Sequence, residues 1–224
     1  MTRLSRKIRA GFSVLAIVGL VLPVPSAFAG GDDFDLDFAA VAPQGDGYWN
    51  DGTIGQDIVK SLATPPYTLH CGEIVTFLTQ IRLDPSAPGP EDIEVLHQFT
   101  RGTTGQQGVC LGSLVRAQIN HGDPGIVGDG GSTVTVLDTS SSGPMFTKGA
   151  ILSVKVRVSD LDPGATTVLR EDIRIYCDPG TRPTGILQAR LGGAAVVNPP
   201  AEVGIINTGD QTIPVVVNLL STPS

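Results

Sequence analysis

The sequence has 224 residues, with 22 acidic and 15 basic side chains and a formal net charge of −7. A surface with this excess of carboxylates repels the phosphates of nucleic acids and of anionic lipids, so neither is an expected partner. The 28 glycines and 17 prolines exclude a fold of long helices and favour many turns.

The first 29 residues have the order of a secretory signal sequence. Four basic residues are followed by an apolar stretch over residues 10–22 and by the small-residue pattern Ala27-Phe28-Ala29. This stretch is too short to cross a bilayer of about 30 Å as a helix. We therefore predict cleavage before Gly30, export to the periplasm, cell surface or medium, and no stable membrane insertion afterwards; an uncleaved N-terminal anchor is the alternative. Because none of the 22 acidic residues is removed with the four basic ones, the mature chain would carry a net charge of −11.

A short acidic lead follows and contains two candidate ligand sites. Asp33, Asp35 and Asp37 alternate with apolar residues, so a strand would place their carboxylates on one face, about 6.5–7 Å apart. A calcium ion would relieve their repulsion, which makes calcium the only cofactor candidate; a solvated edge strand without metal is the simpler interpretation. Tyr48 and Trp49 could stack on a sugar ring, or Trp49 could instead fill the base of the first of two predicted β-modules, at residues 67–139.

The rest of the chain alternates apolar and polar residues in short runs bounded by Gly, Pro, Asp or Ser, a pattern typical of β-strands. Eight such runs cover residues 74–83, 92–99, 113–119, 132–138, 151–160, 166–176, 185–191 and 211–219. Only residues 55–63 have a weak helical pattern. The sequence therefore predicts an all-β fold.

The first four runs and the last four share landmarks in the same order. The tripeptide LDP at residue 83 recurs at residue 161, and EDI at residue 91 recurs at residue 171. We interpret this as a duplicated β-module of about four strands. Because four strands bury only one face, two arrangements are open: tandem sandwich modules over residues 67–139 and 143–221, after the lead at residues 30–66, or one pseudo-symmetric sandwich. We favour the tandem modules.

The two units open with CGEIVTFLTQIRLD, followed by EDIEV, and with KGAILSVKVRVSDLDPG, followed by EDIRI. These stretches resemble the Gly-x-x-Val-x-Phe/Val opening of immunoglobulin-like repeats in bacterial surface and adhesion proteins, and the resemblance covers residues 67–220. It implies immunoglobulin-like sandwiches that act as spacer, adhesive module or envelope component. It also implies partners among other surface or extracellular proteins or glycans, and no catalytic residues.

Each candidate catalytic or metal-binding motif lacks a residue or a spacing that its chemistry requires. The stretch GDGGS at residues 128–132 places Gly130 where the nucleophile loop of chymotrypsin-like proteases has serine, and Ser132 lies beyond both glycines. The acidic loop before Glu171 has Ala165 where a calcium-binding helix-loop-helix needs glycine. The histidines and cysteines lack zinc-ligand spacing. We therefore predict a protein that is not an enzyme.

Three cysteines remain after the signal sequence: Cys71, Cys110 and Cys177. Export permits a disulfide, and the odd number leaves one thiol over. In a meander of hairpins, the start of the first strand and Cys110 would lie at the same edge. We therefore predict a Cys71–Cys110 disulfide, with Cys177 as a buried free thiol or an intermolecular link. The alternative, Cys71–Cys177, would join the two units and favour the single pseudo-symmetric sandwich.

The leading functional hypothesis is an exported, non-enzymatic protein of a bacterial envelope or extracellular matrix with a structural or adhesive role. The alternative is a carbohydrate- or calcium-binding module that uses the aromatic pair or the aspartate face of the lead. A secreted hydrolase without a recognisable motif is the third hypothesis.

Overall fold

The computed structural model describes residues 34–41, 58–63, 69–102, 108–178, 186–197 and 211–218, and every helix or strand within these ranges is a β-strand. The all-β prediction is therefore confirmed. In chain order the strands are β1 (Phe34–Val41), β2 (Ile58–Val59), β3 (Ile74–Leu83), β4 (Glu91–Thr100), β5 (Val109–Ile119), β6 (Thr133–Ser141), β7 (Ile151–Leu161), β8 (Thr166–Cys177), β9 (Leu187–Val196) and β10 (Thr212–Val215). The weak helical pattern of residues 55–63 gives no helix in its described part, which contains β2.

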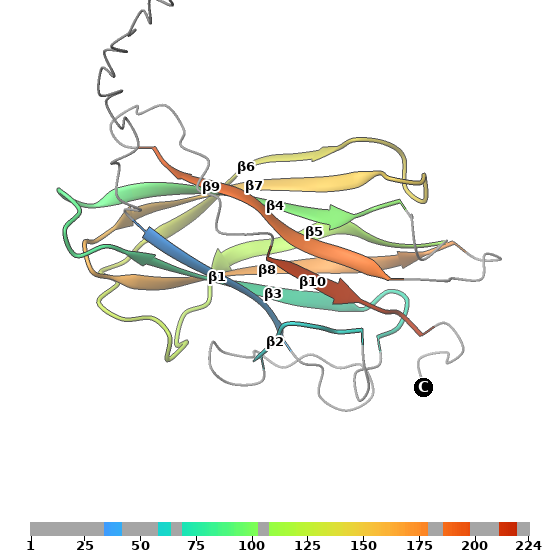
Figure 1. Ribbon diagram of the computed structural model, residues 1–224, viewed down its shortest axis with the longest axis horizontal. Coiled ribbons are helices and arrows are strands. Elements are labelled where there is room, and N and C mark those ends of the chain that lie inside the picture. Colours follow the sequence, from blue (N-terminus) through green and yellow to red (C-terminus); the bar gives the residue numbers. More distant parts are fainter. Residues whose placement is uncertain are drawn as a thin grey trace, which may run out of the picture. The chain divides into compact units, whose positions relative to one another are not determined.

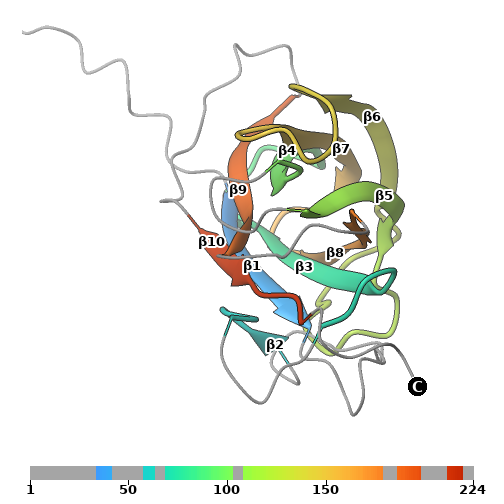
Figure 2. The ribbon, with the colours of Figure 1, turned by 90° about the vertical axis from the view of Figure 1, so that its right-hand side faces the viewer.

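The strands form two antiparallel sheets of five strands each (Figures 1 and 2). Sheet 1 has the order β2-β1-β3-β8-β5 and sheet 2 has the order β10-β9-β4-β7-β6. In Figure 2, β5 and β6 lie on one side of the sandwich, and β10, β1 and β2 lie on the other. The first side is called here the open side and the second the closed side.

Alternation of apolar and polar residues determines which face of each strand is buried. In β7, even-numbered residues from Leu152 to Val158 are buried, whereas Lys155 and Arg157 are partly exposed. Successive side chains of a strand point to opposite faces, so a period of two places one set in the core. β8 differs because it is buried on both faces: Val168 on its outer face packs with Leu78 and Ile126.

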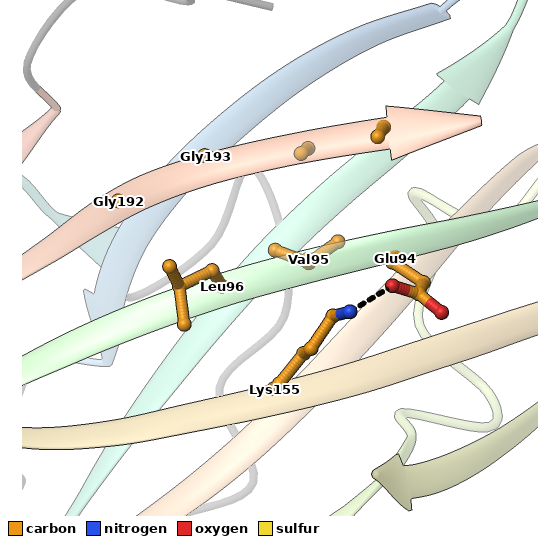
Figure 3. A pocket seen from close by; sticks show the side chains of 8 residues that line it. Glu94, Val95, Leu96, Lys155, Gly192 and Gly193 are labelled. Atoms are coloured by element: carbon orange, nitrogen blue, oxygen red, sulfur yellow. Dashed lines mark ion pairs between the residues drawn. The ribbon is translucent and has the colours of Figure 1, made fainter. Parts of the chain in front are cut away.

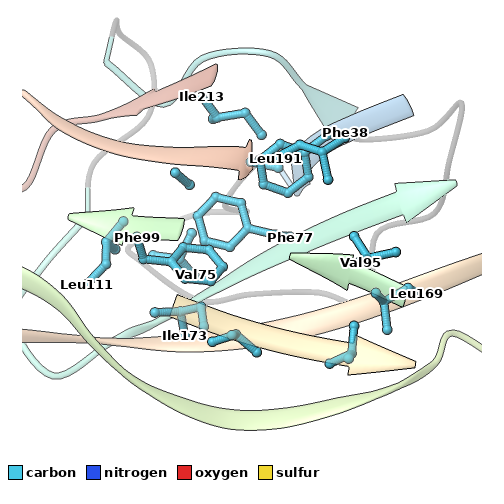
Figure 4. Packing of buried hydrophobic residues seen from close by; sticks show 14 of the residues in the cluster. Phe38, Val75, Phe77, Val95, Phe99, Leu111, Leu169, Ile173, Leu191 and Ile213 are labelled. Carbon is cyan, nitrogen blue, oxygen red and sulfur yellow. The ribbon is translucent and has the colours of Figure 1, made fainter. Parts of the chain in front are cut away.

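The two sheets share one apolar core, in which phenylalanine rings meet across the interface (Figure 4). Phe77 of β3 in sheet 1 lies 5.3 Å from Phe99 of β4 in sheet 2, measured between ring centroids. Phe38 of β1 stacks on Phe77 at 5.7 Å. Truncating a buried phenylalanine to alanine costs about 3–5 kcal/mol, so these rings contribute strongly to the packing of the two sheets.

The structure does not confirm two separate tandem modules. Sheet 1 contains β3 and β5 of the first range together with β8 of the second, and sheet 2 contains β4 and β6 together with β7, β9 and β10. β3 pairs with β8, and β4 pairs with β7 and β9, so consecutive strands β3 and β4 lie in opposite sheets. The described residues, all of which lie within 32–224, form one compact unit. The physical reason is burial of apolar surface. Because each sheet takes strands from both units, the two units share one core between two sheets, which the four strands of one unit could not build alone.

The disulfide joins Cys71 to Cys177, so the predicted Cys71–Cys110 bond is wrong. In the β3–β8 register Ile74 lies opposite Arg174, and continuing that register by three residues places Cys71 opposite Cys177, with 5.6 Å between their Cα atoms. Cys110 is a buried free cysteine in β5, on the far side of β8 from β3. The wrong pairing followed from the assumption that consecutive strands form hairpins.

The closed side is joined by residues 211–218, which pass from sheet 2 toward sheet 1. β10 pairs with β9, and Leu62 then donates its N–H to Pro214 O (2.7 Å) and accepts from Val216 N (3.2 Å). The side chain of Gln211 bonds the backbone of β1: Phe38 N donates to Gln211 Oε1 (2.5 Å), and Gln211 Nε2 donates to Leu36 O (3.0 Å). The amide thus pairs with β1 as a neighbouring strand would.

Candidate functional site

The predicted calcium face is only partly within the described residues. Asp33 lies outside them. Asp35 and Asp37 lie two residues apart in β1, which places them on one face of the strand. Lys60 Nζ forms an ion pair with Asp37 and donates a hydrogen bond to Phe38 O at 2.8 Å. In the described ranges a lysine therefore faces the Asp37 carboxylate, and no group of three or more His, Cys, Asp or Glu side chains there is arranged to hold a metal ion.

The predicted sugar-stacking pair, Tyr48 and Trp49, lies outside the described residues.

Ser132, which the sequence pattern does not support as a nucleophile, is buried and donates a hydrogen bond from Oγ to Asp129 Oδ2 at 2.7 Å. Asp129 also accepts from the Ser132 backbone N–H at 2.8 Å. Burial alone would raise the pKa of Asp129, but hydrogen bonds from Thr167, Ser132 and Gly131 outweigh it and lower that pKa. These contacts close a turn.

A hydroxyl, an imidazole and a carboxylate line up in the core between the sheets. His97 of β4 places Nε2 3.0 Å from Thr79 Oγ1 and Nδ1 2.6 Å from Glu171 Oε2. This is the order of nucleophile, base and orienting acid in a catalytic triad. The side chain of His97 is 0% exposed and that of Glu171 1%, and the ring of Phe38 lies 4.8 Å from the imidazole. A group without access cannot touch substrate, so this cluster is a polar tie between the two sheets.

Sequence reasoning missed this tie because its residues come from three strands, and their pairing is tertiary. A signal was nevertheless present. His97 stands between Val95 and Phe99 at an inward position of β4, where a polar residue needs a partner. Glu171 interrupts the inward apolar set of β8 in the same way.

The outer face of sheet 1 holds a second polar cluster around Asp172, which is buried. Thr76 Oγ1 donates to Asp172 Oδ1 at 2.7 Å, Arg170 Nε donates to Oδ1 at 3.0 Å, and Arg116 Nε donates to Oδ2 at 2.8 Å. A polar cavity of about 350 Å³ lies beside Arg116 and Arg170, next to His121. Asp172 engages both guanidinium groups, so the cluster connects β3, β8 and β5. Because Asp123 also lines the cavity, two carboxylates face the two guanidinium groups and leave little net charge to attract an anion.

The outer face of sheet 2 carries an apolar hollow of about 230 Å³ (Figure 3). It is lined by residues of β4, β7 and β9: Glu94, Val95, Leu96, Lys155, Gly192, Gly193, Ala194 and Ala195. A β-bulge creates it, because the β4–β9 register shifts at Leu96 and leaves Gly192 unpaired. A Cβ on Gly192 would lie 3.2 Å from Leu96 O, so glycine suits this close approach. The small residues of β9 leave Leu96 uncovered by larger side chains.

The rim of this hollow is a compensated ion cluster. Glu94 pairs with Lys155, as Figure 3 shows, and Glu94 Oε1 accepts from Arg157 Nη2 at 2.6 Å. Burial alone would raise the pKa of Glu94, but hydrogen bonds from Lys155 and Arg157 outweigh it and lower that pKa. The hollow therefore has an apolar floor and a polar rim, the arrangement that accepts an aliphatic or aromatic side chain of a partner. We take it as the candidate functional site.

No protein-family model matches this sequence, and no curated protein matches it. Among the described residues, the structure has no helix whose length and apolarity would suffice to cross a membrane.

Proposed function

We propose that the protein is an exported, non-enzymatic β-sandwich of a bacterial envelope or extracellular matrix, with a structural or adhesive role. The observation that carries this proposal is the Cys71–Cys177 disulfide. Disulfides persist in oxidising compartments and are rare where thiols are kept reduced. The disulfide therefore agrees with the predicted secretory signal, and it suits a protein that must stay folded outside the cell.

We further propose that the sandwich arose by duplication of an immunoglobulin-like unit. The strand order supports this: β3, β8 and β5 are neighbours in sheet 1, and their proposed counterparts β7, β4 and β9 are neighbours in the same order in sheet 2. β4 and β8, which carry the repeated EDI tripeptide, are each the middle strand of their three. One pseudo-symmetric sandwich accounts for these three strands of each unit and for the shared core, whereas the fourth strands of the two units, β6 and β10, both lie in sheet 2.

The adhesive role rests on the hollow of sheet 2. Two ion pairs among the described residues already engage groups that could do chemistry: His97 with Glu171 in the core, and Arg116 with Asp172 on the outer face of sheet 1. The hollow, by contrast, offers an apolar floor at the surface. A partner protein with an exposed aliphatic or aromatic side chain fits it, and the ion pairs at the rim would exclude water around that side chain.

Export is tested by expressing the full-length chain with a C-terminal tag in a bacterial host and fractionating the cells. We expect a mature N-terminus at Gly30, recovery outside the cytoplasm, and a Cys71–Cys177 peptide in non-reducing maps. Cytoplasmic retention of an uncleaved chain with reduced cysteines would refute the proposal.

Adhesion is tested by coating beads with the mature protein and measuring their attachment to cells or matrix. Leu96→Arg, which fills the hollow with a charged side chain, should abolish attachment. Val127→Arg is the matched control because Val127 is an exposed residue that does not line the hollow.

A glycan array with and without calcium tests the alternative function: saturable binding that is lost on Trp49→Ala would replace the adhesive role by carbohydrate binding. Labelling by a serine-directed activity probe that is lost on Ser132→Ala would instead establish the hydrolase hypothesis.

A further inference from the structure

The open side of the sandwich ends in an unusually exposed strand. β6 is the last strand of sheet 2, and among the described residues β7 is the only strand that pairs with it. Every residue from Thr133 to Ser141 is exposed except Val134, which is partly buried. The strand therefore presents one whole edge of backbone N–H and C=O groups, and both of its faces, to solvent.

The apolar residues of β6 extend the core face without being covered. Val136 lies opposite Val156 of β7 and therefore points to the inner side of the sandwich. Val156 is 0% exposed, whereas Val136 is 42% exposed. Leu137, at the bulge of β6, and Val115, at a bulge of the other open-side strand β5, are also exposed. A further strand beside β6 would continue sheet 2 and cover Val136.

The β6 edge has few of the features that usually keep an edge strand from pairing. Natural edges are protected by lysine, by proline, by bulges or by a covering segment. β6 has neither lysine nor proline, and Asp138 is its only charged residue. It has one bulge, whereas β5 has two. Its residues, TVTVLDTSS, are rich in the β-branched types that favour strands.

We propose that β6 pairs antiparallel with β6 of a second copy of this chain, so that the two copies of sheet 2 become one ten-stranded sheet across a two-fold axis. Inward residues of β6 are those opposite Val158, Val156 and Val154, namely Val134, Val136 and Thr139. A two-fold axis at Val136 keeps inward residues opposite inward residues.

Charge excludes the neighbouring register. Leu137 is bulged out of the β6–β7 ladder, and we take it as bulged in both copies. With the axis at Val136, the two copies of that valine then lie opposite each other, Val134 lies opposite the partner's Thr139, and Thr135 lies opposite the partner's Asp138. An axis at Asp138 would place Asp138 opposite the partner's Asp138, and like charges directly opposite are destabilising. The register at Val136 thus forms apolar and polar cross-strand pairs and no like-charge pair.

The association state tests the proposal. The secreted mature chain should have twice the mass of one chain by size exclusion with light scattering. Val136→Lys, which would oppose two ammonium groups at the axis, should give a monomer with unchanged circular dichroism. Ile186→Lys is the matched control, since Ile186 is an exposed residue directly before β9, and it should stay dimeric. A monomeric wild type, or a Val136→Lys variant that stays dimeric, would overturn the proposal.

Cross-linking tests the register independently, and it decides the matter if Val136→Lys fails to fold. Val136→Cys should form an intermolecular disulfide with itself on mild oxidation. Thr135→Cys should cross-link with Asp138→Cys when the two variants are mixed, and neither should cross-link alone. Cys110 is buried and should not compete. Equal cross-linking by a Val127→Cys control would show that the contact is not at β6, which contradicts the proposal.

Discussion

The closed and open sides of the sandwich differ in how their strand edges are satisfied. On the closed side, Gln211 bonds the backbone of β1, and Leu62 bonds residues on either side of Val215. On the open side, no described segment pairs with the outer edge of β6. Both edges consist of the same backbone groups, so the difference lies in what the chain places beside them.

This difference shows that closing a sheet edge does not require another full strand. One amide side chain supplies the donor and the acceptor that a strand would supply, and it does so where Phe38 and Ala39 are buried and water cannot substitute. The β6 edge faces solvent, so water can form hydrogen bonds with its backbone N–H and C=O groups when no other strand pairs with them. Closure is therefore found where burial demands it, and the other edge stays available for association.

The closed side continues through Leu69, which bridges to Val217, into Cys71 and its disulfide. Replacing Cys71 and Cys177 by alanine should lower the free energy of unfolding by about 4–5 kcal/mol, because the disulfide closes a loop of more than a hundred residues in the unfolded chain. Urea unfolding of the variant and of the reduced wild type should give the same midpoint. A loss below about 1 kcal/mol would contradict a stabilising disulfide.

Gln211→Ala should break the amide closure of β1. It leaves Phe38 N–H and Leu36 C=O without their partners, so we expect a loss of about 2–4 kcal/mol in the free energy of unfolding. Gln188→Ala is the control, because the side chain of Gln188 is exposed, and its effect should stay within about 0.5 kcal/mol. Equal losses in both variants would show that the Gln211 amide contributes no closure.

A matched pair of valines compares the interior with the open side directly. Val156→Ala should cost about 2 kcal/mol, because two buried methyl groups are lost and a cavity is left. Val136→Ala should be measured at a protein concentration at which the wild-type dimer is dissociated, so that only the packing of Val136 within one chain is compared with that of Val156. There it should cost less than about 0.5 kcal/mol. Similar costs at both positions would mean that β6 is as well packed as β7.

Cys110, in the open-side strand β5, provides the smallest effect and a dependence on pH. Burial raises the pKa of its thiol to about 11. The thiolate fraction near neutral pH is then about a hundredfold below that of an unfolded thiol, and iodoacetamide should label native Cys110 correspondingly slowly. The sign for stability follows from linkage: the contribution of the neutral thiol is complete below the unfolded pKa near 9 and is lost as pH rises toward 11. Rapid labelling of the native protein would contradict this burial.

The approximate positions of most strands were determined by the sequence alone, because alternation and turn residues are local properties. The run predicted at residues 74–83 is β3 to the residue, and the run at 166–176 differs from β8 by one. The run at 113–119 begins four residues after β5 does, the run at 185–191 ends five residues before β9 does, and β2 was not among the predicted runs. A pleated chain places every second side chain on one face whatever lies beside it. Local pattern therefore predicted most of the strands and the all-β class, and it gave no information about which strands are neighbours.

Only the tertiary structure decided the pairing, and with it everything that depends on pairing. β8 lies between β3 and β5, which brings Cys177 to Cys71 and leaves Cys110 free. β4 faces sheet 1 across the core, which brings His97 to Glu171. Neither choice can be made within one strand, because exchanging neighbours leaves each strand's own alternation unchanged. What distinguishes the native arrangement is that it fills one core with apolar side chains from both halves at once.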